Sequence, residues 1–190
     1  MFNVIKAVPL LLMTLFSASV AAQDWIWAPD FPEGIQLPPI SAPDQSGTVR
    51  TLADLSGENG LVLVLSRSFD WCPYCISQLQ QLVEVAPEFE ALGFNVATMT
   101  YDSLETLNNA AIDYDIDFPL LRDEDTRHFS AIGIVNDQYE PGERAYGIPY
   151  PGIFLLRPDG TIEAKFAEVD YRIRPDFSEV LAVAEALWQQ

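Results

Sequence analysis

The sequence predicts a mixed α/β sandwich with a central sheet and flanking helices. Short apolar runs such as residues 61–65 are typical of strands buried on both faces. These runs alternate with stretches in which apolar residues recur every three or four positions, as expected for helices that join parallel strands. Two later apolar runs flank the turn signal at residues 158–160, which predicts an antiparallel hairpin.

The expected elements follow from these patterns and from local helix signals. Pro87 should kink or split the helix in which it lies, and Gly93 is a suitable residue to end it. Asp102 and Glu105 resemble a capping box, with Asp102 as the N-cap. In chain order we expect an edge strand (48–52), a buried strand (61–65), a helix (75–92), a buried strand (94–100), a helix from Asp102, a strand (118–121), a helix (126–132), a loop (136–150), two hairpin strands (152–156 and 161–166) and a last helix capped by Asp176 and Glu179.

The N-terminus predicts export. Residues 1–22 combine a basic start, an apolar core and small residues before a cleavage point after Ala22, or alternatively after Ala21, which is typical of a secretory signal peptide. The apolar stretch is short for a membrane span, and an uncleaved anchor is the alternative. We expect a periplasmic or extracellular protein with no stable membrane anchor after cleavage. A Trp- and Pro-rich arm at 23–36 and a single domain at 37–190 follow.

The charge of the chain limits its partners. The formal net charge is −18, and removal of the signal peptide, which contains Lys6 and no acid, makes it −19. Such an acidic chain is unsuited to binding nucleic acid or anionic membranes. An extracytoplasmic compartment also permits disulfides.

The only two cysteines, Cys72 and Cys75, lie where a buried strand leads into a helix. The first turn of a helix stabilises a thiolate and lowers its pKa from about 8.5 toward roughly 3.5–7.5. Their spacing brings both sulfurs onto one side of one turn, close enough to bridge. Pro73 suits that first turn. We therefore expect Cys72 to be the exposed nucleophile and Cys75 to resolve the mixed disulfide.

The cysteine pair has two other interpretations. A structural zinc site needs four ligands, whereas the chain offers two cysteines and one histidine, His128, so we expect no metal and no cofactor. His128 is expected to be a surface or packing residue. An inert structural disulfide stays open, although so small a loop would add little stability.

Four stretches taken in order resemble one known group of proteins: residues 71–75, 100–103, 118–123 and 146–160. They are similar to the redoxin branch of the thioredoxin superfamily, the alkyl hydroperoxide reductase and thiol-specific antioxidant (AhpC/TSA) type. The resemblance covers roughly residues 37–187 and implies a thioredoxin-like three-layer sandwich with a redox-active Cys72–Cys75 disulfide.

The resemblance also implies a substrate groove beside the cysteines. Pro151 matches the family's cis-proline, with Pro149 as a competing candidate. If Pro151 is cis, the backbone of Tyr150 would pair with an incoming chain as a strand does. The expected groove is completed by Trp71, Pro73 and Tyr74. Trp71 should also shield the cysteine pair.

Several positions depart from the family pattern. Ser66 stands where thioredoxins carry a buried acid, and Asp70 is a candidate substitute. Leu65 and Phe69 stand seven and three residues before Cys72, where peroxiredoxins carry Pro and Thr, and Pro151 replaces the family's arginine. Arg67 is close in sequence. A peroxide needs donors that polarise its O–O bond, so these losses argue against a fast peroxidase.

Three functions are therefore expected in descending order. The first is an exported thiol–disulfide oxidoreductase that exchanges with protein or small-molecule thiols and disulfides, with a membrane electron-relay reductase or a thiol oxidant as its redox partner. The second is a peroxiredoxin-like antioxidant that reduces peroxides through Cys72. The third is a metallochaperone, although copper-delivery relatives use a wider cysteine spacing and a distant histidine.

Overall fold

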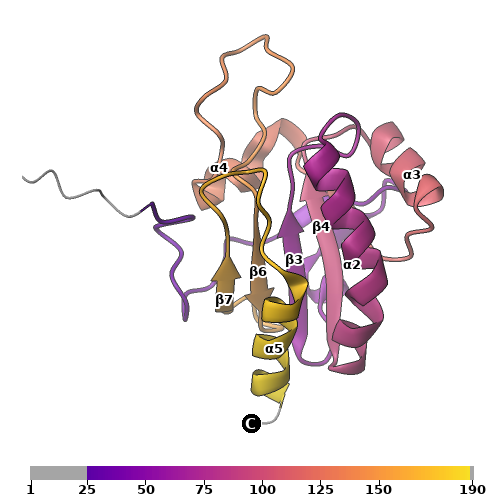
Figure 1. Ribbon diagram of the computed structural model, residues 1–190, viewed down its shortest axis with the longest axis vertical. Helices are drawn as coiled ribbons and strands as arrows, with labels where there is room; N and C mark the ends of the chain where they lie inside the picture. The colour runs from indigo at the N-terminus through magenta and orange to yellow at the C-terminus, as the bar shows by residue number, and fades with distance from the viewer. Residues whose placement is uncertain (1–24, 189–190) are drawn as a thin grey trace, which may run out of the picture.

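The computed structural model describes residues 25–188, so the predicted signal peptide at residues 1–22 lies outside the described part. Its main sheet has five strands in the order β5-β4-β3-β6-β7 (Figure 1). Strands β3, β4 and β5 run parallel, whereas β6 pairs antiparallel with β3 and β7. Their bounds are β3 Gly60–Leu65, β4 Phe94–Thr100, β5 Leu120–Arg122, β6 Gly152–Leu156 and β7 Ile162–Phe166. The predicted mixed α/β architecture is confirmed.

Strand β3 is the centre of the sheet, and all six of its residues are buried. Because side chains alternate between the faces of a strand, Val62 and Val64 join one apolar core, while Leu61, Leu63 and Leu65 join the other. A strand buried on both faces needs the continuous apolar run that the sequence shows.

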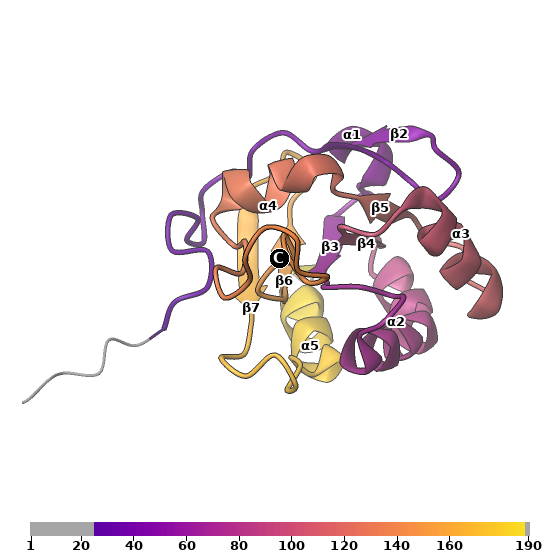
Figure 2. The same ribbon diagram turned by 90° about the horizontal axis from the view of Figure 1, so that it is seen from above.

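Helices cover both faces of this sheet (Figure 2). On one face lie α2 (Pro73–Ala91), α3 (Leu104–Asp113) and α5 (Phe177–Trp188), whose buried side chains share the core of Val62. On the other lie α1 (Leu52–Leu55) and α4 (Arg127–Ile132), which follows a 3-10 turn, η1 (Glu124–Thr126). None of the helices within residues 25–188 is long and apolar enough to cross a bilayer.

Two expected elements differ in the structure. The strand expected at 48–52 is β2 (Val49–Thr51), which pairs with β1 (Ser41–Pro43) in a separate two-stranded sheet instead of forming an edge of the main one. Helix α2 runs unbroken through Pro87. The Pro87 ring lies on the exposed face of the helix, while Ala86 and Phe89 on either side are buried. Their packing holds the helix together although Pro87 has no N–H to donate.

Asp102 is not the N-cap of α3, contrary to the expectation. Ser103 is, and its Oγ accepts the backbone N–H of Thr106 at 3.1 Å. The Asp102 side chain is buried and turns instead toward Ser68 and Phe69, before the cysteines. Both residue types cap helices well, and only the tertiary contacts decide between neighbours.

The N-terminal arm packs against the sheet through Trp27, which is 5% exposed. Its ring centroid is 4.5 Å from that of Phe154 in β6. Lys165 in β7 donates from Nζ to the carbonyl oxygens of Trp27 and Ala28 at 2.6 and 2.9 Å. The arm thus covers part of the face that carries α4.

Candidate active site

Cys72 and Cys75 form a disulfide at the N-terminus of α2. Cys72 is the N-cap, with an extended backbone, and its Sγ accepts the N–H of Cys75 at 3.3 Å. Pro73 takes the first helical position, where no N–H is needed. The local sequence thus places both sulfurs at the positive end of a helix that follows the carboxyl end of β3. Their redox activity stays a prediction.

Both cysteines are buried, with relative exposures of 1% for Cys72 and 0% for Cys75. The expectation that Cys72 is an exposed nucleophile is therefore wrong for this disulfide state. The reason is tertiary, because both cysteines pack into the apolar core that contains Val62 and Val64. Residues 167–176 between β7 and α5, here named the covering loop, also place Arg174 against the disulfide. Arg174 Nη2 lies 3.4 Å from Cys75 Sγ.

Aromatic contacts attach the covering loop to the site. The ring of Tyr171 meets that of Tyr74 edge-on, with centroids 5.9 Å apart. The guanidinium of Arg67 lies 4.0 Å from the Tyr171 ring centroid and 5.2 Å from that of Trp71. Trp71 and Tyr74 therefore contact the chain's own loop and arginines, and Arg67 joins the loop to the segment before the cysteines.

Arg174 brings a positive charge to the disulfide, and Arg67 lies close enough to Arg174 to affect its pKa. Arg67 is 4% exposed and donates from Nη2 to the Tyr139 hydroxyl at 3.2 Å. The Nε atoms of both arginines are buried without a hydrogen-bond partner, and no carboxylate among residues 25–188 forms an ion pair with either guanidinium. Burial, and then the charge of Arg67, lower the pKa of Arg174 to about 10, so it is still a cation at neutral pH.

On its other side Trp71 is fixed by hydrogen bonds. Its Nε1 donates to the Tyr101 hydroxyl at 2.9 Å, and that hydroxyl donates to the Arg144 carbonyl at 2.7 Å. Asp70, a candidate base, is exposed and pairs with Arg144 Nη2 at 2.6 Å. The Asp70 carboxylate is therefore engaged by an arginine at the surface.

A buried carboxyl that the sequence analysis did not assign to the site holds the segment before the cysteines. Asp102 Oδ1 accepts from the Ser68 hydroxyl at 2.7 Å, and Oδ2 accepts from the Phe69 N–H at 2.7 Å and the Thr100 hydroxyl at 2.9 Å. Burial raises the pKa of Asp102 although these hydrogen bonds oppose the shift. The sequence held one signal for this role, since Asp102 comes two residues after β4, at the carboxyl end of the sheet where functional residues collect.

Tyr150 and Pro151 do not offer the expected groove. The Tyr150–Pro151 bond is trans. The Tyr150 N–H donates to the Ile134 carbonyl at 2.7 Å, and its own carbonyl accepts from Trp27 Nε1 at 2.9 Å. Both backbone groups that an incoming strand would use are thus bonded within the chain. Pro151 is buried at the start of β6.

His128 is a packing residue. It is 7% exposed, its Nδ1 lies 2.8 Å from Asp123 Oδ1, and its Nε2 accepts the Ser41 N–H at 3.3 Å. The described residues contain no cluster of three or more Cys, His, Asp or Glu side chains that could hold a metal.

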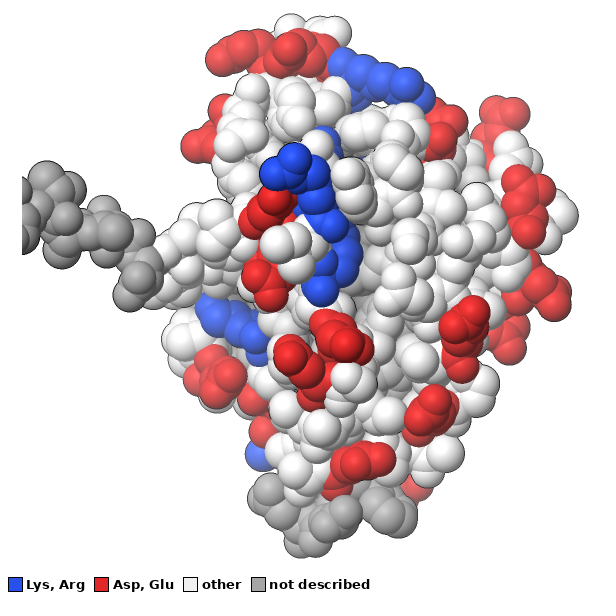
Figure 3. All heavy atoms as spheres, viewed as in Figure 1, with Lys and Arg blue, Asp and Glu red and all other residues white. Residues whose placement is uncertain are grey.

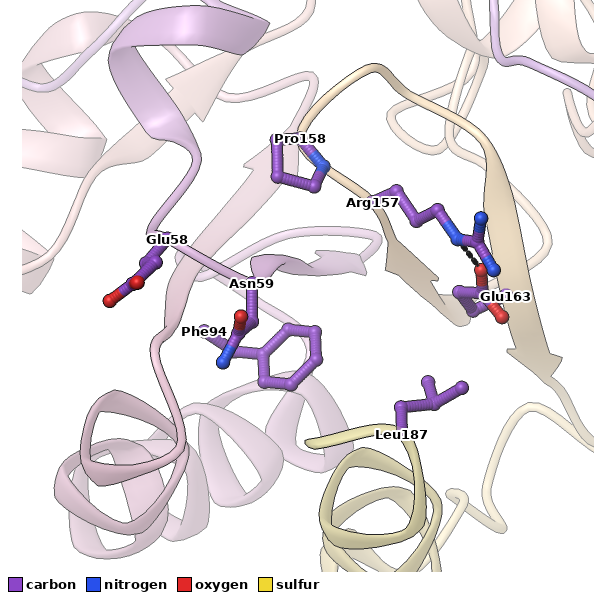
Figure 4. Close-up of a pocket in the computed structure, with 7 residues that line it drawn as sticks. All are labelled: Glu58, Asn59, Phe94, Arg157, Pro158, Glu163 and Leu187. Atoms are coloured by element: carbon purple, nitrogen blue, oxygen red, sulfur yellow. Dashed lines mark ion pairs between the residues drawn. The ribbon is translucent and has the colours of Figure 1, made fainter. Parts of the chain in front are cut away.

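A separate pocket lies at the opposite end of the sheet (Figure 4). Asn59 and Phe94, at the starts of β3 and β4, line it with Leu187 of α5. Arg157 and Glu163 in its wall form an ion pair with each other. This pocket is therefore remote from the cysteines, which follow the far end of β3.

The surface charge is uneven. Acidic side chains are spread over the face shown in Figure 3, and most of its basic side chains lie in the upper half. Four basic residues lie around the cysteine pair. Arg67 and Arg144 lie over the Trp71 ring, Arg174 contacts Cys75 Sγ, and Arg172 belongs to the covering loop.

Comparison with known proteins matches residues 34–165 to the AhpC/TSA family. Peroxiredoxin Bcp of Escherichia coli (strain K12) is 31% identical over 134 residues, which are 68% of this chain and 81% of that protein. A 1-Cys peroxiredoxin of Onchocerca volvulus is 23% identical over 175 residues, 84% of this chain and 74% of the relative. The crystal structure of peroxidoxin BcpB from Mycobacterium tuberculosis has a TM-score of 0.69 and 20% identity, and the match covers 82% of this chain and 97% of that one.

Proposed function

We propose that this chain, which belongs to the AhpC/TSA family, is a thiol peroxidase that reduces peroxides with the Cys72–Cys75 pair. Its relatives include proteins named peroxiredoxin, one of them 31% identical. Peroxide reduction thus takes first place among the candidate functions. From the sequence alone, exchange with protein disulfides came first.

The observation that carries the proposal is the contact of Arg174 with Cys75 Sγ, with the buried Arg67 close to Arg174. Neither guanidinium is paired with a carboxylate among residues 25–188. Arg67 and Arg174 each keep a free Nε–H. The sequence had suggested that the donors needed to polarise an O–O bond were lost. Arg67, close in sequence, and Arg174, from the covering loop, supply such donors in a desolvated site where they act most strongly.

The reaction takes two electrons from the cysteine pair. One thiolate attacks a peroxide oxygen, becomes a sulfenic acid and releases the other oxygen, which is protonated to an alcohol or water. The second thiol then attacks the sulfenic sulfur, the disulfide forms and water leaves. An external dithiol restores the pair by thiol–disulfide exchange. The Cα atoms lie 5.3 Å apart, within the usual range for a disulfide.

Burial favours a small oxidant over a protein disulfide. Both cysteines are almost inaccessible, and the backbone of Tyr150, which would have paired with a protein substrate, is bonded to Trp27 and Ile134. Hydrogen peroxide or a small organic peroxide needs far less room than an extended chain does.

The proposal keeps the exported location. The expected export rests on the signal-peptide pattern of residues 1–22. The redox partner is then a dithiol outside the cytoplasm, and a membrane electron relay is one source of its electrons.

The test is peroxide consumption by the mature chain with a dithiol reductant. The wild type should consume hydrogen peroxide catalytically, and the Cys72→Ser, Cys75→Ser double variant should not. Reduction of insulin disulfides is measured in parallel. Fast insulin reduction without peroxide consumption would overturn the peroxidase in favour of the oxidoreductase.

A further inference from the structure

The two cysteines have different surroundings. Cys72, at the N-cap, receives one backbone N–H, that of Cys75 at 3.3 Å. Cys75 lies within the helix, and its Sγ faces Arg174 Nη2 at 3.4 Å. The cation thus lies against the second sulfur of the motif. On the basis of the function proposed above, we propose that Cys75 attacks the peroxide and that Cys72 resolves the resulting sulfenic acid. Arg174 is then a catalytic residue.

A full positive charge outweighs the end of a helix dipole. The N-terminus of a helix acts as roughly half an elementary charge, spread over several N–H groups. A guanidinium in contact with a sulfur in a desolvated site interacts more strongly with a thiolate than the same charge would in water. The Cys75 thiolate is therefore the more stabilised of the two.

Arg174 can also act on the leaving oxygen. One of its nitrogens contacts the sulfur, while its Nε–H has no partner, and Arg67 keeps a second free Nε–H. As Cys75 Sγ bonds to the near peroxide oxygen, the O–O bond breaks and charge develops on the far oxygen. These N–H groups can donate to that oxygen until it takes up a proton.

Cys72 is suited to the second step. It lies before the first helical residue, where the backbone is extended. Its thiolate attacks the Cys75 sulfenic sulfur, the S–O bond breaks, and the hydroxyl leaves as water after protonation. The disulfide of the structure results, with one oxygen atom in the alcohol or water first released and the other in this last water.

Single-cysteine variants test the assignment. Each reduced variant is exposed to hydrogen peroxide with dimedone, and the sulfenic acid is located by mass spectrometry. Cys72→Ser should be labelled at Cys75 at a rate close to the wild-type rate of peroxide attack, whereas Cys75→Ser should react at Cys72 about 100-fold more slowly.

The outcomes separate this inference from the proposed function. Equal or faster labelling of Cys72 in the Cys75→Ser variant would overturn the assignment and leave the peroxidase intact. No labelling in either variant, together with no peroxide consumption by the wild type, would overturn both.

Arg174 is tested in the Cys72→Ser background, where Cys75 is the single thiol. Arg174→Met should raise the thiol pKa, measured by thiolate absorbance, and slow peroxide attack about 100-fold even at a pH where the thiol is fully ionised. Arg174→Lys should restore most of the pKa and less of the rate, because one ammonium replaces the fork of donors. A merely structural role would leave the pKa unchanged.

The matched control is Arg172→Met on the same loop. The Arg172 side chain is 60% exposed and pairs with Asp170 at 2.6 Å. It should leave both pKa and rate unchanged. An equal effect of the two substitutions would show that loss of charge anywhere on the covering loop is enough, and would overturn the role of Arg174.

Discussion

Trp27 Nε1 donates a hydrogen bond to the Tyr150 carbonyl at 2.9 Å, across 123 residues of sequence. The bond joins the N-terminal arm to Tyr150, two residues before β6 begins at Gly152. It uses the carbonyl that a substrate strand would need, and it explains why the expected groove is closed. The next two predictions concern Trp27, its hydrogen bond and its ring.

Trp27→Phe removes the donor and keeps most of the ring that packs on Phe154. Because the Tyr150 carbonyl then loses its partner, the free energy of unfolding should fall by about 1 kcal/mol, up to about 3 kcal/mol if water does not reach it. Urea denaturation measures the change. Trp25→Phe is the control, since Trp25 is 38% exposed. An equal loss in both variants would contradict the importance of the Trp27 hydrogen bond.

Gly152→Ala should displace the arm. A Cβ at Gly152 would come within 2.5 Å of the Trp27 ring. We expect a loss of about 1–3 kcal/mol, typical of an overpacked core. In the Trp27→Ala background the same substitution should cost much less, since the clash is gone. A double-mutant cycle checks this, and additive costs would show that the two residues do not interact.

Asp102 should make stability depend on pH. Burial raises its pKa in the folded chain above the ordinary value of 3.8. The folded state then binds the proton more tightly than the unfolded state, so this contribution is complete below pH 3.8 and is lost as the pH rises through the folded pKa. The hydroxyls of Ser68 and Thr100 can rotate to accept from the protonated form.

The measurement compares wild type with Asp102→Asn in urea denaturation from pH 4 upward. The stability advantage of the wild type should shrink as the pH rises, because only the wild type carries the titrating carboxyl. Parallel stability curves for the two proteins would rule out the raised pKa as a source of pH dependence.

Tyr171→Ala should uncover the disulfide. The substitution removes the ring that contacts Tyr74 and the Arg67 guanidinium. Loss of about 1–2 kcal/mol of aromatic and cation–π contact favours the open loop by roughly tenfold. Reduction of the disulfide by a water-soluble phosphine should accelerate to that extent. Val169→Ala, on the same loop and 72% exposed, should not change the rate. Equal rates in all three proteins would show that the loop does not limit access.

The sequence by itself determined the sheet and the place of the cysteines. Apolar runs buried on both faces and helical periodicity are local patterns, so residues 94–100 were predicted with the bounds that β4 has. The strand-to-helix junction likewise predicted the cysteines at the start of a helix from the motif alone, where the structure has them. Asp102 shows the limit of local patterns. Its residue type could cap a helix, but its side chain is instead buried in contact with Ser68 and Phe69.

Only the tertiary structure decided what surrounds the sulfurs. Arg174 follows Cys75 by 99 residues, and Trp27 precedes Tyr150 by 123. No periodicity or spacing links such positions, because they meet only when the sheet brings the covering loop and the arm to its carboxyl end. The burial of Cys72 likewise depends on the packing of the apolar core around it, and for that reason a local pattern could not predict it.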